Sequence, residues 1–378
     1  MKLLIVSSLG EFGGGAESML YELVKVIRKD AHVEVLFMQD GRLKDAIEEL
    51  GVKTHLIKSP KMRHGFNVLI WMIKYFVFLK QIKPTLVLSW MPKAHLFTSI
   101  PSFIANLPSY WWQHGVPDPP NFFDKITSIL PAKKVGSSST IAKLAQQNLT
   151  KKPVFCTFPG VDIIKHSPNE RNRNRIRKEL GIDEDTILIG NVGRIQRWKR
   201  QDLLIKSLNL LIKKHSNAKV LLVGGNLYNL DNEYEKEVLS LIKELGLEDK
   251  IITTGNQLDV SPYFDAMDIY VHTANGEPFG IVMVEAMLHA KPLIAVKSPG
   301  SLEIIKDGVT GFIVDEGSPE LLNIAMDKMI LEREDFPSIG EQGRTRAIKF
   351  FSNKQMGDSI LRELVPKQYN KNTNKGIV

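Results

Sequence analysis

The chain has 378 residues, of which 43% are hydrophobic and 24% are charged. This balance is typical of a globular protein and excludes a chain that is disordered throughout. At roughly 100–200 residues per domain, the length suggests two domains. Cys156 is the single cysteine, which excludes a disulfide framework and a metal site built on several thiolates, and which fits a reducing cytosol.

The positive charge is concentrated in the first half of the chain. Residues 1–165 contain 21 Lys/Arg and 12 Asp/Glu, a net +9, whereas residues 166–378 contain 29 and 30, a net −1. No acidic residue occurs between Glu49 and Asp118, while eight basic residues do. One-sided charge attracts an anionic partner, either a membrane surface or a nucleic acid; the alternative is a basic surface without such a partner.

In chain order, the first half alternates short apolar strands with helices. The apolar start is too short for a signal peptide and predicts a first strand over Lys2–Ser8. A glycine loop follows, then a helix near Ala16–Lys29 and a strand over His32–Met38. Further strands are predicted at Thr85–Ser89 and near Tyr110–His114.

The apolar segment Phe66–Leu79 allows two interpretations. It is shorter than the roughly 20 apolar residues that span a bilayer, and Lys74 interrupts it. The segment is either a buried helix of the domain or a helix that lies in a membrane interface with its basic flanks on lipid phosphates.

The second half repeats the alternation. Strands are predicted at Ile187–Val192, Lys219–Val223, Ile251–Thr254, Ile269–His272 and Pro292–Val296. Helices are predicted near Asp202–Lys214, Glu233–Leu245, Tyr263–Ala266, Val282–Leu288 and Asn353–Leu364. Two such α/β units predict two Rossmann-like domains with parallel sheets that face a central cleft. The Pro/Gly-containing segment Phe158–Ser167 separates them, and Lys367–Val378 is polar and predicted to be disordered.

The strongest chemical signal is the segment Glu277–Glu285, EPFGIVMVE, in which two glutamates stand eight positions apart. Glu277 lies in the loop after a predicted strand, and Glu285 lies on the helix that follows. The N–H groups of Phe279, Gly280 and Ile281 begin that helix, and a helix N-terminus suits a phosphate. A glutamate one turn into the helix can bind a ribose diol, and the other can hold a sugar hydroxyl.

Three further features lie where predicted strands end, the edge at which open α/β sheets bind ligands. Gly193-Arg194 and Lys199 follow strand Ile187–Val192 and offer two cations for a diphosphate. The glycine run that includes Gly14 and Gly15 follows the first strand and lets the backbone approach a phosphate or a sugar, although the same run also suits a flexible turn. His114 ends a predicted strand of the first half.

Two other patterns are set aside. Asp183-Glu-Asp185 resembles the acidic motif of metal-dependent sugar transferases, but it precedes strand Ile187–Val192 and so lies at the opposite edge from the ligand loops. The nine histidines show no metal-ligand pairing at helical spacing. We therefore expect no metal site.

Taken together, these motifs resemble retaining glycosyltransferase family 4, which has the GT-B fold. Pro159-Gly160-Val161-Asp162 and Glu303–Gly311 also resemble it. The resemblance covers about residues 1–365 and is strongest over 187–315. It implies that the last helix crosses back, so that 1–165 with 353–378 forms the acceptor domain and 166–352 the donor domain.

The resemblance also implies roles. Arg194 and Lys199 would hold the diphosphate of a UDP- or GDP-sugar, Glu285 the ribose and Glu277 the donor sugar, with no cofactor or metal. His114 matches a histidine that contacts the donor sugar near the reacting carbon, so His114 and Glu277 are the expected catalytic residues. Two departures from the family pattern are Pro278, which stiffens its loop, and Arg200, which stands where glycine is common. The expected donor-binding residues are Gly14, Gly15, Arg194, Lys199, Phe279, Gly280, Ile281 and Glu285.

The expected function is that of a retaining hexosyltransferase of surface polysaccharide synthesis (lipopolysaccharide, O-antigen or capsule). Its acceptor would be a glycan or a lipid-linked molecule, and the enzyme would be cytoplasmic and peripheral on the inner membrane. One alternative is another GT-B enzyme of nucleotide sugars, such as an epimerase. A second is a basic nucleic-acid-binding protein, although the sequence contains no recognition motif of that class.

Overall fold

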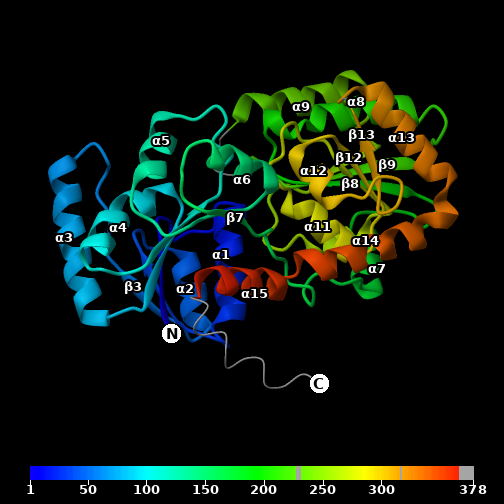
Figure 1. The fold of residues 1–378 in the computed structure, drawn as a ribbon. Coiled ribbons are helices and arrows are strands. Elements are labelled where there is room, and N and C mark those ends of the chain that lie inside the picture. Colours follow the sequence, from blue (N-terminus) through cyan, green and yellow to red (C-terminus); the bar gives the residue numbers. More distant parts are fainter. Residues whose placement is uncertain (227–230, 316, 366–378) are drawn as a thin grey trace, which may run out of the picture. The chain divides into compact units, whose positions relative to one another are not determined.

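The computed structural model describes residues 1–226, 231–315 and 317–365, and the chain divides into two units (Figure 1). Unit 1 contains residues 1–160 and the chain from Ser352 onward, and unit 2 contains Val161–Phe351. The division falls inside the segment Phe158–Ser167. The predicted disorder of Lys367–Val378 lies outside the described residues.

Unit 1 is built on a parallel sheet of seven strands in the order β3-β2-β1-β4-β5-β6-β7. All its strand pairs run parallel, as helical crossovers between consecutive strands require. The central strands are almost wholly buried, which explains their continuous apolar sequences. The strands are β1 (Lys2–Ser7), β2 (His32–Phe37), β3 (Lys53–Leu56), β4 (Leu86–Trp90), β5 (Ser109–Gln113), β6 (Val135–Ser137) and β7 (Val154–Cys156).

Helices cover both faces of this sheet. One face packs apolar side chains against α1, α2 and α15, and the other packs them against α3 and α4. The helices are α1 (Gly15–Ile27), α2 (Arg42–Glu49), α3 (Gly65–Ile82), α4 (Pro92–Ile104), α5 (Phe122–Ile129), α6 (Thr140–Gln147) and α15 (Asn353–Leu364).

The final helix α15 belongs to unit 1, as the resemblance implied. Met356, Ile360 and Leu364 recur every four residues and are buried in the core that contains α1. Tyr110 on β5 donates a hydrogen bond from its hydroxyl to the Leu364 carbonyl at 3.0 Å. Gly160 lies against the start of α15, because a Cβ there would stand 2.5 Å from the Cα of Asn353.

Unit 2 is built on a second parallel sheet, with the order β10-β9-β8-β11-β12-β13. Its strands are β8 (Ile187–Val192), β9 (Ala218–Val223), β10 (Ile251–Thr253), β11 (Ile269–His272), β12 (Leu293–Val296) and β13 (Phe312–Val314). In its described residues the helices are α7 (Glu170–Glu179), α8 (Gln201–Leu211), α9 (Asn232–Glu244), α10 (Ser261–Ala266), α11 (Ile281–Leu288), α12 (Pro299–Ile304), α13 (Pro319–Leu331) and α14 (Phe336–Phe351), and the 3-10 turns include η1 (Arg197–Lys199) and η3 (Arg333–Asp335). Both units are therefore Rossmann-like, as the sequence predicts.

The strand order creates one switch point in each sheet. In unit 1 the chain proceeds outward from β1 in one direction and then returns to β4 on its other side. In unit 2 the same reversal separates β8 from β11. Ligands of open α/β sheets bind outside the carboxyl ends of the strands at such a point. In unit 2, the loops after β8 and β11 therefore lie where such a ligand would bind.

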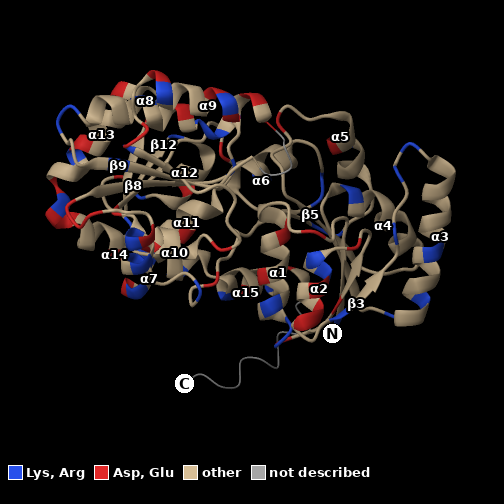
Figure 2. Ribbon diagram, turned by 180° about the vertical axis from the view of Figure 1, so that it is seen from behind, with Lys and Arg blue, Asp and Glu red and all other residues tan. Residues whose placement is uncertain are grey.

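The two units also differ in surface charge. Figure 2 shows acidic and basic residues mixed along α8 and α9 of unit 2, whereas α3 of unit 1 carries basic residues and no acidic ones. This distribution agrees with the net charges of the two halves of the sequence.

Candidate functional site

The loop after β8 and the loop after β11 are tied together through their backbones. The N–H of Asn275 donates to the carbonyl of Trp198 at 2.8 Å, and the hydroxyl of Thr273 donates to the carbonyl of Lys199 at 2.7 Å. These bonds fix the turn η1 beside the end of β11. Lys199 is thus held by the fold next to the segment that contains Glu277.

Lys199 and Glu277 form a largely buried ion pair. Their side chains are 15% and 8% exposed, and Lys199 Nζ lies 2.6 Å from Glu277 Oε2. His272, the last residue of β11, places its Nε2 3.3 Å from the same oxygen. The expected roles put Lys199 on the diphosphate and Glu277 on the sugar, and the structure shows that the two side chains are also each other's partners.

The pKa values of this cluster follow from burial and charge. Burial by itself would raise the pKa of Glu277, but the contact with His272 and the charge of Lys199 lower that pKa to about 2. Burial lowers the pKa of Lys199 from its ordinary value, an effect that Glu277 opposes. Burial also lowers the pKa of His272. Glu277 is therefore an anion at neutral pH, held by the lysine.

The start of α11 presents backbone donors close to this pair. Gly280 has φ of +89° and turns the chain into the helix, a conformation that favours glycine. Among the described residues, no acceptor takes a hydrogen bond from the N–H groups of Gly280 or Ile281. Such N–H groups and the positive end of the helix dipole suit an anion.

Helix α12 holds this loop in place. The N–H of Gly300 donates to the carbonyl of Glu277 at 2.9 Å. A Cβ at Gly300 would stand 2.0 Å from the carbonyl oxygen of Phe279, so only glycine allows this approach. The ring of Phe279 packs edge-on against Phe351, with 5.7 Å between the ring centroids.

The second glutamate, Glu285, lies one turn into α11. Its side chain is 16% exposed, and its Oε1 lies 3.9 Å from His166 Nε2. The structure thus places Glu285 on the same short helix as the backbone donors, in agreement with the spacing of the motif. The assignment of Glu285 to a ribose stays a prediction.

The remaining cations of this loop differ in availability. Among the described residues, none forms a hydrogen bond or an ion pair with the guanidinium of Arg194. The charge of Arg194 also lowers the pKa of the nearby Lys199. Arg200 instead directs its Nε at Asp202 Oδ1, at 3.4 Å. Its φ of +55° lies in the left-handed region, which glycine adopts without the steric cost that a side chain brings.

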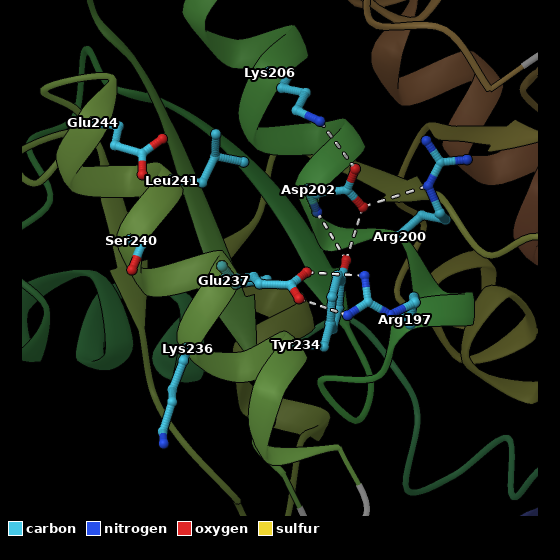
Figure 3. Close-up of a pocket in the computed structure, with 11 residues that line it drawn as sticks. Arg197, Arg200, Asp202, Lys206, Tyr234, Lys236, Glu237, Ser240, Leu241 and Glu244 are labelled. Atoms are coloured by element: carbon cyan, nitrogen blue, oxygen red, sulfur yellow. Dashed lines mark hydrogen bonds and ion pairs between the residues drawn. The ribbon is translucent and has the colours of Figure 1, made fainter.

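A surface pocket near this loop is separate from the predicted site. Figure 3 shows it between the turn η1, α8 and α9, where Arg197 pairs with Glu237 and Tyr234 donates to Asp202. Lys199 and Glu277 are not among its lining residues. Arg197 and Glu237 form an ion pair in this pocket, and Asp202 pairs with Arg200 and Lys206. The pocket therefore offers no unpaired charge at these positions and is not part of the predicted donor site.

In unit 1, His114 follows the carboxyl end of β5 and packs against two tryptophan rings. Its ring meets that of Trp90 edge-on at 4.6 Å and lies 6.3 Å from that of Trp112. Trp90 in turn donates from Nε1 to the carbonyl of Ala16 at 3.0 Å. Trp90 thus contacts both His114 and the first turn of α1, which directly follows Gly14.

Burial lowers the pKa of His114 to about 3, so its imidazole is neutral at pH 7. Its Nε2 is buried and finds no hydrogen-bond partner among residues 1–226, 231–315 and 317–365. A neutral imidazole with an unused nitrogen can exchange a hydrogen bond with a sugar hydroxyl. Its catalytic role remains a prediction.

The sequence patterns did not identify His272 and Gly300 as residues of the site, and they placed Asp183-Glu-Asp185 at the correct edge of the sheet. His272 carried a signal, since it ends a predicted strand, and Gly300 follows the Ser-Pro that begins α12. The triplet Asp183-Glu-Asp185 is exposed and precedes β8, at the amino edge of the sheet. It is therefore remote from the loops at the carboxyl edge.

Comparisons with known proteins agree with this geometry. Residues 172–346 match the family model "Glycosyl transferases group 1". The capsular polysaccharide biosynthesis glycosyltransferase CapM of Staphylococcus aureus is 24% identical over 88% of this chain and 89% of its own length. A D-inositol 3-phosphate glycosyltransferase of Corynebacterium jeikeium is 30% identical over 51% of this chain and 47% of its own length.

A solved structure, Anabaena HepE in complex with UDP, is 25% identical and covers 96% of this chain and 99% of its own, with a TM-score of 0.87. The two parallel Rossmann-like sheets and the returning last helix define the GT-B class of glycosyltransferases. Within that class, the chain is similar to the glycosyl transferases group 1, whose family model it matches over residues 172–346.

Proposed function

We propose that the protein is a retaining hexosyltransferase that uses a UDP- or GDP-sugar and acts in surface polysaccharide synthesis. The observation that carries the proposal is the cluster of Lys199, Glu277 and the open N-terminus of α11, with Arg194 beside it. Cations and N–H donors suit a diphosphate, and a fixed carboxylate suits sugar hydroxyls.

The same cluster supports the chemical step. When the bond between sugar C1 and the diphosphate oxygen breaks, negative charge develops on the diphosphate. Arg194, Lys199 and the N–H groups of Gly280 and Ile281 are preorganised to stabilise that charge, which is the task a metal ion performs in other transferases. The acceptor oxygen bonds to C1, and its proton passes to the departing diphosphate.

Retention is supported by the residue types available. A double displacement needs a free carboxylate nucleophile, but Glu277 is engaged by Lys199 and His272, and the predicted catalytic group of unit 1 is His114. We therefore favour attack by the acceptor on the same face of the sugar from which the diphosphate leaves.

The donor and the acceptor class are supported by relatives. HepE has been solved with UDP and with UDP-glucose, which makes UDP-hexoses the first donors to test. CapM is a glycosyltransferase of capsular polysaccharide biosynthesis and matches along most of both chains. The name of this relative supports a glycan acceptor, and the basic first half supports our proposal of a lipid-linked acceptor at the cytoplasmic face of an anionic membrane.

A thermal-shift panel of UDP, GDP and their sugars tests the donor. A true ligand raises the unfolding temperature with the logarithm of its concentration over its dissociation constant. Lys199→Ala should abolish the shift, whereas Lys206→Ala, on the exposed side of α8, should retain it. No shift with any nucleotide would contradict the proposal, and NMR of the product's anomeric proton would disprove retention if the configuration were inverted.

A further inference from the structure

Helix α3 is attached to unit 1 through one narrow face. Trp71, Tyr75 and Leu79 recur every four residues and are its buried side chains. Trp71 donates from Nε1 to the carbonyl of Ile57 at 2.9 Å and stacks on Tyr75, with 5.4 Å between the centroids. These contacts fix the orientation of the helix on the sheet.

The opposite face of α3 is also apolar, and it is exposed. At about 100° per residue, this face is centred roughly half a turn from the buried one. Phe66 is 76% exposed and Ile73 57%. Surface helices of globular proteins place polar residues on this side, so an apolar face indicates a partner. We call this face the α3 ridge; it consists of Phe66, Leu69, Ile70, Ile73 and Val77.

Positive charge surrounds the α3 ridge. Lys61 and Arg63 precede the helix, Lys74 and Lys80 lie on it, and Lys83 follows it. Within the described part of the chain, none of these five forms an ion pair. Figure 2 shows the same helix with basic residues and without acidic ones.

We propose that the α3 ridge docks on an anionic lipid bilayer, with α3 lying in the plane of the interface. Apolar side chains would enter the acyl boundary while the lysines meet lipid phosphates, so one surface satisfies both features. A second copy of the chain fits less well, because a two-fold interface would place the same basic flanks against each other.

The helix is attached in a way that excludes a spanning orientation. It is the one helix of the described residues with the length and hydropathy to cross a membrane. Its 18 residues measure about 27 Å, close to the thickness of the hydrocarbon core. However, Trp71, Tyr75 and Leu79 bind it along its length to the folded domain, and Lys74 lies exposed near its middle. Of the faces of α3, the ridge is therefore the one available to lipid.

The inference deepens the proposed function, on which it rests for the location of a lipid-linked acceptor. Docking through unit 1 would hold the acceptor-binding unit at the surface where such an acceptor resides. It would also explain why the excess charge lies in unit 1 and not in unit 2.

Vesicle co-sedimentation tests the inference directly. The full chain is mixed, without donor or acceptor, with vesicles of phosphatidylglycerol and phosphatidylcholine or of phosphatidylcholine alone. We expect binding to the anionic vesicles that weakens with salt. Lys61→Gln with Arg63→Gln should weaken it about 25-fold, since each charge near the surface contributes about five-fold. The matched control is Arg171→Gln with Lys213→Gln, two exposed residues of unit 2.

The ridge has its own variant and control. Phe66→Ser with Ile73→Ser should weaken binding by about ten-fold or more for each side chain. Leu239→Ser with Ile324→Ser, which removes exposed apolar residues from helices of unit 2, should leave binding unchanged. Circular dichroism verifies that each variant is folded.

Three results would overturn the inference: equal binding to neutral and anionic vesicles, ridge variants that bind like the wild type, or a dimer in sedimentation velocity that the ridge variants dissociate. The first result would show that lipid charge does not matter for binding, and the second that the ridge does not contact the bilayer. The third would assign the ridge to contact with a second copy of the chain. Vesicle binding needs no sugar transfer, so its failure and a failure of the proposed function are observed in separate assays.

Discussion

The buried pair of Lys199 and Glu277 predicts a large energetic coupling that a double-mutant cycle can measure. Removing one member of a buried ion pair leaves the other uncompensated, at a cost of about 3–5 kcal/mol. Lys199→Met should destabilise unit 2 by about this amount, because Glu277 would keep only the contact with His272. Adding Glu277→Gln should restore much of the loss, since no isolated charge then remains.

Urea unfolding followed by ¹⁹F NMR of fluorotryptophan gives a readout specific to unit 2. The chain has five tryptophans, and Trp198 is the one that lies in unit 2. Its resonance, assigned with Trp198→Phe, reports unfolding of that unit separately from unit 1. Lys199 Nζ lies 3.9 Å from the centroid of the Trp198 ring, so a substitution of Lys199 changes the chemical shift of this resonance even in the folded state. The quantity compared between variants is therefore the urea concentration at the midpoint of unfolding.

The pair of Arg197 and Glu237 is a matched control in the same unit. Its closest atoms are 2.7 Å apart, close to the 2.6 Å of the buried pair, but its side chains are 60% and 54% exposed. Solvent screens such pairs, so its coupling should be far smaller. A coupling between Lys199 and Glu277 no larger than that of the control would refute the reasoning, as would turnover of Lys199→Met within a few-fold of the wild type instead of a loss on the order of 100-fold.

Four further predictions follow from the site and the core. Glu285→Ala should weaken binding of the bare nucleotide in calorimetry, because its expected contact is the ribose; unchanged affinity would remove that role. Transfer activity should survive EDTA, and strict dependence on added magnesium or manganese would contradict the proposed stabilisation by fixed charges. Gly300→Ala should displace the Phe279 carbonyl and weaken donor binding, whereas Gly343→Ala, whose Cβ would have 3.6 Å of clearance, should not. Burial would raise the pKa of Glu34, but hydrogen bonds to Lys2, His55 and His32 outweigh it and lower that pKa to about 2 from an ordinary 4.5. The stabilisation of about 3 kcal/mol is therefore present above pH 4.5 and lost as the pH falls towards 2. In urea unfolding, the stability of the wild type should fall by about 3 kcal/mol more between pH 7 and pH 2 than that of Glu34→Gln, in which the other carboxylates still titrate.

Much of the fold and part of the site could be predicted from the sequence because both depend on local patterns. Short apolar strands between helices indicate parallel sheets, and the carboxyl ends of such strands gather ligand loops. Arg194 and Glu277 could therefore be assigned to one edge before their positions were known. The structure shows in addition that β8 and β11 are neighbours.

The contacts that complete the site depend on tertiary packing and could not be read from local patterns. Lys199 and Glu277 are 78 residues apart, and their meeting requires the order of the strands and the backbone bonds between two loops. Gly300 matters through a close approach to another loop, which one sequence does not reveal. For Phe66–Leu79, composition left two alternatives; the structure excludes the fully buried one, because only Trp71, Tyr75 and Leu79 are buried.

The return of α15 to unit 1 has a consequence for biosynthesis. Unit 2 is inserted into unit 1, so a nascent chain contains all of unit 2 before it contains the last helix of unit 1. Until then, the core against α1 lacks Met356, Ile360 and Leu364, and apolar surface that they cover stays exposed. Domains generally fold as units during synthesis. The unit that is translated first is therefore the one completed last, and its apolar face against α1 stays uncovered until the ribosome has finished the last helix.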